Sequence, residues 1–176
     1  EAATLPCAGV TAWHALMLAG RPVQAGETVL IQGTGGVSLQ ALLLAKAAGA
    51  RLIATSSSDD KLAKARMLGA DILINYKKTP EWQDEVMKLT AGRGVDCVIE
   101  VGGAGTLQRS MQSLGFAGKV CMIGVLSGFE GDTNPHTIML KGGSMHGIFV
   151  GNRAMFEQLN RAIEVNDIHP VIDQVF

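Results

Sequence analysis

The stretch from Thr28 to Gly49 constrains the fold of this chain more than any other. A short apolar run over residues 29–31 predicts a buried parallel strand. The sequence GTGGVS follows from Gly33 to Ser38, and a helix-forming stretch then runs to Gly49. A second apolar run comes directly after that glycine. Strand, glycine turn, helix and strand in this order predict a βαβ unit.

The glycine turn has the chemistry to hold the pyrophosphate of a dinucleotide. Gly33 permits a tight turn, and Gly35 lets the backbone approach the phosphates, which then face the free N–H groups of the next helix. The pattern G-x-G-x-x-G ends on Ser38 rather than glycine, so its context carries the prediction. The alternative is a turn that only packs helix against strand. The predicted cradle comprises Gly33, Thr34, Gly35, Gly36 and Val37.

Strand-like and helix-like stretches alternate along the whole chain. Strands are expected over residues 29–31, 52–55, 72–75, 96–100, 118–123 and 144–149. Helices are expected over residues 11–19, 37–48, 59–68, 80–90, 105–113 and 153–165, with helix stops at Gly49 and Gly69. Residues 132–141 are expected to be a polar connection. The alternation predicts an α/β fold, a doubly wound parallel six-stranded sheet with helices on both faces.

Composition narrows the class of protein further. The chain has 176 residues and a net charge of −1, and its charged residues form no long run of one sign. Nothing therefore indicates nucleic-acid binding. No apolar stretch reaches membrane-spanning length, and no signal peptide is visible. Of three cysteines, Cys97 and Cys121 lie in apolar strand-like runs, where buried reduced thiols and a cytoplasmic location are expected. The chain begins at Glu1 on helix-like sequence and ends at Phe176 inside an apolar pattern, from which we expect a fragment.

Five blocks of sequence resemble the medium-chain dehydrogenase/reductase superfamily, which holds zinc alcohol dehydrogenases and zinc-free quinone oxidoreductases. The blocks are LPCAGVTAWHAL, VLIQGTGGVS, GADILINY, GRGVDCVIEVGG and GKVCMIG. The resemblance covers the chain in order, but only the cofactor-binding half of such proteins. It implies that residues 1–176 form one NAD(P)-binding domain, with the N-terminal catalytic domain and the C-terminal return segment outside this chain. It also implies a homodimer formed through the sixth strand.

The choice of cofactor depends on the end of the second predicted strand. A carboxylate about 20 residues past the glycines would hold the adenosine ribose of NAD. Ser56 and Ser57 stand there instead, and their hydroxyls can donate hydrogen bonds to a 2′-phosphate. Lys61 lies one turn into the next helix and is either a phosphate ligand or a solvated surface charge. The resemblance points the same way, so NADP(H) is favoured over NAD(H).

Two acidic residues beside this place weigh against a phosphate. Asp59 and Asp60 are close in sequence and negative. Acidic residues also favour the first turn of a helix, and Ser57 with Asp60 has the spacing of a capping box. We therefore interpret these carboxylates as helix-start residues.

The ends of the remaining strands supply further candidates, because ligands of such sheets bind beyond the carboxyl ends of the strands. By resemblance, Tyr76 lies near the adenosine end of the cofactor, and the loops after the last three strands border the nicotinamide. Each loop can equally be an ordinary strand-to-helix turn. The loop candidates are Val101, Gly102, Gly124, Val125, Phe149 and Val150.

The chain contains no evident catalytic group of its own. Cys7 aligns with a zinc ligand of alcohol dehydrogenases, but a catalytic zinc needs three protein ligands, and the four histidines are scattered singly. Zinc is therefore not expected within this chain. By resemblance Thr11 reaches the nicotinamide or its phosphates; the alternative is a hydroxyl at a helix start. There is no acid–base pair and no nucleophile with an evident partner.

These observations predict the cofactor-binding half of an NADP(H)-dependent oxidoreductase. Hydride would pass between the nicotinamide and a small-molecule substrate, either a carbonyl or alcohol or a quinone or enone. One alternative is a zinc- and NAD-dependent alcohol dehydrogenase. Another, of a different class, is a non-catalytic nucleotide-binding or assembly module. The chain by itself is expected to bind cofactor and to have little activity.

Overall fold

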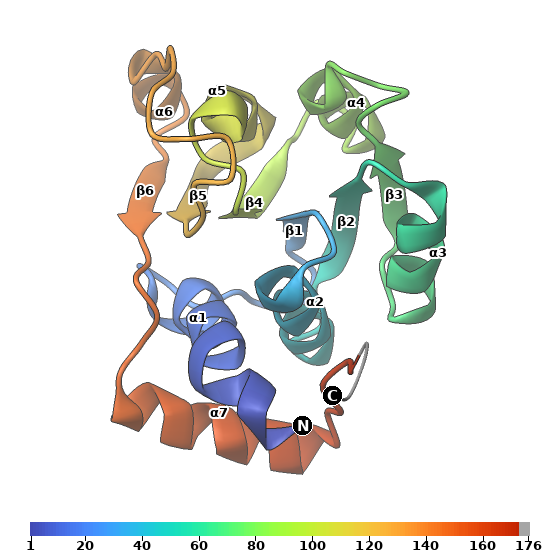
Figure 1. The fold of residues 1–176 in the computed structure, drawn as a ribbon. Coiled ribbons are helices and arrows are strands. Elements are labelled where there is room, and N and C mark those ends of the chain that lie inside the picture. Colours follow the sequence, from blue (N-terminus) through green and yellow to red (C-terminus); the bar gives the residue numbers. More distant parts are fainter. Residues whose placement is uncertain (173–176) are drawn as a thin grey trace.

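The computed structural model describes residues 1–172. The apolar pattern noted at Phe176 therefore lies outside the described residues. Six parallel strands form one sheet in the order β3-β2-β1-β4-β5-β6 (Figure 1). From β1 the chain builds first towards β3 and then towards β6, which makes the sheet doubly wound, as predicted. The strands are β1 (Thr28–Gln32), β2 (Arg51–Ser56), β3 (Ile72–Asn75), β4 (Val95–Glu100), β5 (Leu114–Met122) and β6 (Ser144–Gly147).

Helices cover both faces of this sheet. The side chains of Val29 and Ile31 pack in one core with residues of α1, α2 and α7, whereas Leu30 between them packs in a second core with residues of α4 and α5. Figure 1 shows α1, α2 and α7 gathered on one side and α4 and α5 on the other. Because successive strand residues point to opposite faces, a strand buried on both faces is apolar throughout. The helices are α1 (Val10–Trp13), α2 (Gly36–Ala47), α3 (Asp59–Met67), α4 (Trp82–Leu89), α5 (Ala104–Ser113), α6 (His136–Leu140) and α7 (Arg153–Asn166).

The first helical segment starts earlier than the helix predicted over residues 11–19. A 3-10 turn at Ala2–Thr4 leads into a π-helical turn at Leu5–Gly9, then into α1 and a second π-helical turn at His14–Leu18. Leu5 already packs against the first core, so the apolar side chain ahead of α1 holds helical backbone in place. The predicted start was wrong because the burial of this residue is a tertiary contact.

The last strand is shorter than the predicted run over residues 144–149. The N–H of Ile148 still donates to the carbonyl of Met122 at 2.8 Å, but the chain then leaves the sheet. Val150 adopts a φ of 55°, and its carbonyl oxygen lies 2.8 Å from Nδ1 of His14. Contacts with the first helical segment therefore redirect the chain after Gly147 towards α7.

The connection predicted over residues 132–141 lies between β5 and β6, as expected, and it contains the short helix α6, which was not predicted. Pro135 precedes its first residue, and the side-chain oxygen of Asn134 accepts a hydrogen bond from the backbone N–H of His136 at 3.0 Å. Ile138 packs against the second core. A proline, a local turn held by the Asn134 side chain and one apolar anchor accompany this single helical turn.

The predicted helix stops and the predicted buried thiols are confirmed. Gly49 and Gly69 have positive φ of 80° and 107°, as helix stops require. Cys97 and Cys121 are buried free thiols, whereas Cys7 is exposed. Among the described residues, no helix is both long and apolar enough to cross a membrane.

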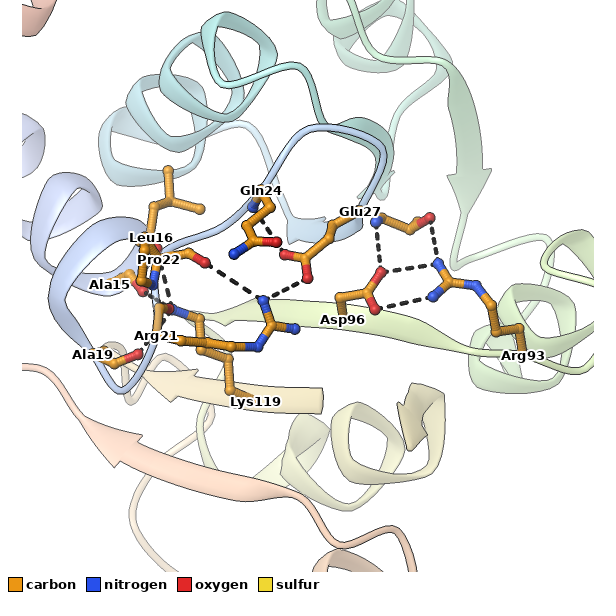
Figure 2. A network of polar contacts seen from close by, with 11 residues as sticks. Ala15, Leu16, Ala19, Arg21, Pro22, Gln24, Glu27, Arg93, Asp96 and Lys119 are labelled. Carbon is orange, nitrogen blue, oxygen red and sulfur yellow. Dashed lines mark hydrogen bonds and ion pairs between the residues drawn. The ribbon is translucent and has the colours of Figure 1, made fainter. Parts of the chain in front are cut away.

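A polar network joins the elements at the amino ends of the strands (Figure 2). Lys119 of β5 is only 5% exposed, and its ammonium donates to four backbone carbonyls between Ala15 and Arg21. Asp96 of β4 accepts hydrogen bonds from the backbone N–H of Thr28 at 2.7 Å and from the guanidinium of Arg93 at 2.9 Å. The network thus fixes the chain that leads into β1 at the end of the sheet opposite its carboxyl edge.

Candidate functional site

Two adjoining cavities open at the carboxyl ends of the central strands. The first has a volume of about 410 Å³ and is lined by Gln32, Gly33, Thr34, Gly35, Gly36, Val37, Ser38, Ser56, Ser57, Lys61, Tyr76, Val101, Ile123, Gly124 and Leu126. The second has a volume of about 460 Å³ and is lined by Gln32, Gly33, Thr55, Tyr76, Pro80, Trp82, Val101, Gly102, Thr106, Arg109, Leu126 and Ser127. Because five residues line both cavities, the cavities form one continuous cleft.

The glycine turn after β1 forms an open cradle in the first cavity. Gly33 has a φ of 69°, and its N–H donates to the carbonyl of Thr55 at 2.8 Å. A Cβ placed on Gly33 or on Gly35 would meet no other atom within 4 Å, so the space in front of the turn is free. The hydroxyl of Ser38 donates to the Gln32 carbonyl at 2.7 Å, which ties α2 to the end of β1.

The start of α2 is suited to an anion. Gly35 is the residue before the helix, no side chain caps it, and the first turn carries no acidic residue. The first N–H groups of a helix have no partner within it and carry partial positive charge. They lie beside the open space that Gly35 leaves, and this combination can bind a phosphate.

The end of β2 brings Ser56, Ser57 and Lys61 to the same cavity. Ser56 is buried, Ser57 is partly buried and Lys61 is exposed. No carboxylate belongs to the described residues that line this cavity. Two serines and one lysine therefore meet the phosphate cradle without an acidic neighbour among its walls.

The predicted capping box at the start of α3 is absent. The residue before the helix is Ser58, and no side-chain hydrogen bond caps the helix, so the prediction from Ser57 and Asp60 was wrong. Asp59 instead pairs with Lys78 at 2.5 Å and accepts a hydrogen bond from Asn75 at 2.7 Å. Hydrogen bonds from Lys78 and Asn75 lower the pKa of the Asp59 carboxyl.

A buried carboxylate organises the end of β4. Glu100 is 1% exposed, and its oxygens accept hydrogen bonds from the Gln32 amide at 2.7 Å and from the Gly102 N–H at 2.7 Å. Further donors are the Gly103 N–H, the Thr106 hydroxyl and the Ser110 hydroxyl. The carboxylate thereby holds the loop that forms the wall shared by the two cavities. Sequence reasoning did not single out this residue, although an acidic residue closing the apolar strand CVIE was a usable signal.

The other predicted residues divide between inside and outside the cleft. Tyr76, Val101 and Gly124 line the first cavity, and Gly102 lines the second. A Cβ on Gly124 would lie 2.1 Å from the carbonyl oxygen of Val101. Close packing of two loops therefore requires glycine at position 124, irrespective of any ligand.

Four candidates lie outside both cavities: Thr11, Val125, Phe149 and Val150. Thr11 is buried inside the first helical segment, and its hydroxyl donates to the Cys7 carbonyl at 2.6 Å, so it does not cap a helix start. Val125 lines a separate cavity of about 170 Å³. The side chain of Phe149 is 95% exposed, and the carbonyl of Val150 faces His14.

Residues 1–172 contain no group of three or more His, Cys, Asp or Glu side chains that could hold a metal ion. Cys7 is exposed, and Thr11 bonds to its carbonyl rather than its sulfur. The described residues therefore do not by themselves provide a three-ligand zinc site.

A doubly wound parallel sheet with an open glycine cradle between its first strand and first crossover helix defines a Rossmann-type dinucleotide-binding fold. Residues 36–164 match the family described as zinc-binding dehydrogenase. The chain belongs to this family, within the medium-chain dehydrogenase/reductase superfamily.

Individual relatives agree with this assignment. A zinc-type alcohol dehydrogenase-like protein of Schizosaccharomyces pombe is 48% identical over 100% of this chain and 52% of its own length. Quinone oxidoreductase of Sus scrofa is 30% identical over 88% of this chain and 48% of its own length. The crystal structure of a putative alcohol dehydrogenase from Sinorhizobium meliloti is 45% identical and superimposes with a TM-score of 0.91, covering 99% of this chain and 50% of that one. The chain thus spans about half the length of these relatives.

Proposed function

We propose that this chain is the cofactor-binding half of an oxidoreductase that uses NADP(H) in preference to NAD(H). The observation that carries the proposal is the first cavity, where the glycine cradle meets Ser56, Ser57 and Lys61 with no carboxylate among its described lining residues. A carboxylate in this place would repel a 2′-phosphate, whereas hydroxyl and ammonium groups attract it.

Each part of the cleft has a role in this proposal. The pyrophosphate lies on the first N–H groups of α2, where Gly35 leaves room for it. Ser56 and Ser57 donate to the 2′-phosphate, and Lys61 adds positive charge at the rim. Val101 and Gly102 line the second cavity and are proposed to border the cofactor there.

The nicotinamide carries the hydride when the cofactor is bound. The residues of this chain bind and orient the nicotinamide, and none of them is proposed to donate or accept a proton in the reaction. Thr11, Val125, Phe149 and Val150 lie outside both cavities. Contact of these four residues with the nicotinamide end of the cofactor, as the family resemblance implies, therefore stays a prediction.

The rest of the protein would complete the reaction. Residues 1–176 are proposed to be one cofactor-binding domain, with an N-terminal catalytic domain and a C-terminal return segment elsewhere in the protein. That domain would supply the substrate contacts for a carbonyl or alcohol, or for a quinone or enone. The exposed backbone edge of β6 would pair with its copy in a homodimer, because an edge strand presents unpaired N–H and C=O groups.

One alternative within the same family is a zinc- and NAD-dependent alcohol dehydrogenase. The exposed side chain of Cys7 favours it, since a ligand completed by residues outside this chain must be accessible. Metal analysis of the full-length protein separates the two. If the full-length protein contains zinc and the variant Cys7→Ser loses both the zinc and the activity, the alternative is supported.

The test is calorimetric titration of the full-length protein with NADPH and with NADH under matched conditions. Tighter binding of NADPH, weakened selectively by Ser56→Asp, supports the proposed phosphate pocket. Gly35→Ala should weaken both cofactors by at least tenfold and leave the melting temperature unchanged, because its Cβ meets only empty space in the protein. Equal or tighter binding of NADH would overturn the cofactor preference.

Turnover needs a separate assay. Oxidation of NADPH in the presence of quinones, enones and aldehydes would support the oxidoreductase. Binding of cofactor without turnover on any of these substrates would favour a non-catalytic nucleotide-binding module.

A further inference from the structure

The carboxylate nearest in sequence to Ser57 is held by two side chains from the turn after β3. Nζ of Lys78 lies 2.5 Å from one oxygen of Asp59, and the amide of Asn75 donates to the other oxygen at 2.7 Å. Asp59 and Lys78 are 19 residues apart in sequence. Both oxygens of the carboxylate thus have partners, and its charge is balanced by an ammonium.

The turn that carries Lys78 is built onto the wall of the first cavity. The side-chain oxygen of Asn75 accepts a hydrogen bond from the backbone N–H of Lys77. Its backbone carbonyl accepts hydrogen bonds from the N–H groups of Lys78 and Thr79. The N–H of Tyr76 donates to the carbonyl of Ser56 at 3.0 Å. Asn75 therefore fixes the turn and also clamps Asp59, so the ion pair has a defined place beside the serines.

The ion pair lowers the negative charge at this rim. Asp59 lies two residues from both Ser57 and Lys61, which line the cavity. Charges interact over about 8 Å at physiological salt. With Lys78 in place, the charge of Asp59 is balanced, and Asp60 is left as the one acidic residue in the first turn of α3 without an ion pair among the described residues, next to Lys61. Without Lys78, a bare carboxylate would oppose a 2′-phosphate, whereas it could accept a hydrogen bond from the 2′-hydroxyl of NADH.

We propose that Lys78 is a specificity-determining residue, which allows NADP(H) binding by masking Asp59 rather than by contacting the phosphate. The inference rests on the proposed preference for NADP(H). Neither Lys78 nor Asp59 lines the cavity, so the effect is electrostatic and acts across the rim. Exposed ion pairs contribute modestly, so loss of this one should change the preference by about threefold to fivefold.

The experiment compares dissociation constants of NADPH and NADH for the full-length protein and three variants. Lys78→Met should lower the preference for NADPH, and the effect should shrink as salt is added. Lys77→Met is the matched control, because Lys77 is an exposed neighbour on the same turn without an ion pair among the described residues. The double variant Asp59→Asn with Lys78→Met should restore the preference.

Each contrary result is distinct. An equal loss in Lys77→Met would mean general attraction by positive charge and would overturn the role of Lys78. Failure of the double variant to restore the preference would mean direct contact of Lys78 with the phosphate, which also overturns masking. An unmodified protein that prefers NADH would instead overturn the proposed cofactor, and this result is read before any variant is made.

Discussion

The side-chain amide of Gln32 lies 2.7 Å from the carboxylate of Glu100 and joins the carboxyl ends of β1 and β4. The Gln32 oxygen also faces the backbone N–H groups of Val101 and Gly102, each at 3.2 Å. Gln32 lines both cavities of the cleft. One buried pair thus sets the shape of the wall on which both halves of the cleft depend.

Glu100→Gln should destabilise the protein and weaken cofactor binding. The new NH₂ group would replace one of the two oxygens and would face either the Gly102 N–H on the Oε1 side or the Gln32 amide on the Oε2 side, which leaves a buried donor unpaired. Each unpaired buried donor costs about 1–3 kcal/mol. Urea unfolding measures the loss of stability, and titration with NADPH measures the loss of affinity. Unchanged values in both would contradict the role given to this carboxylate.

Gly124→Ala should destabilise the fold, in contrast to Gly35→Ala. The added Cβ would overlap the Val101 carbonyl, so two loops must move apart. Overpacking of this kind costs about 1–3 kcal/mol. Thermal unfolding of the two variants side by side checks the contrast. Equal stability of the two would mean that the loop after β5 adapts freely.

Lys119→Met should lower the free energy of unfolding by about 3 kcal/mol, because buried carbonyls lose a charged donor. The ammonium contacts the carbonyls of Ala15, Leu16, Ala19 and Arg21 at distances between 2.8 and 3.1 Å. Lys46→Met, which removes an exposed lysine paired with Asp71 at 3.4 Å, is the control and should cost less than about 1 kcal/mol. Similar losses in the two variants would show that the buried ammonium adds nothing special.

Asp96→Asn should flatten the dependence of stability on acid pH. Burial alone raises the pKa of this carboxyl, but hydrogen bonds from Arg93 and from the Thr28 N–H outweigh it, so the pKa lies below its usual value of 3.8. A lowered folded-state pKa stabilises the protein above the unfolded value, and this stability is lost as the pH falls through the folded value. Unfolding curves between about pH 5 and pH 2 test this.

The matched control for this pH effect is Asp84→Asn, which changes an exposed carboxylate that has no ion pair among the described residues. The free energy of unfolding of this variant should fall with decreasing pH as steeply as that of the unmodified protein. If the free energy of unfolding of Asp96→Asn falls equally steeply, other carboxylates cause the acid sensitivity.

Local chemistry made most of the fold predictable. The apolar run of β1, the glycine turn and the stops at Gly49 and Gly69 depend on residues close together in sequence. The same holds for the gathering of Ser56, Ser57 and Lys61 at one strand end. The failures fall where distant contacts decide. Leu5 packs on the core and extends the first helical segment, and the contact between Val150 and His14 spans 136 residues.

By itself, the sequence determined the order of strands and helices, the glycine cradle and the family, because strand and helix periodicity and turn chemistry act over a few residues. Only the tertiary structure decided which strand-end residues share a cavity and which do not. It also decided that Asp59 pairs with Lys78 and that Glu100 holds Gln32 across 68 residues. Such pairs depend on how parallel strands align at one edge, and no local pattern records that alignment.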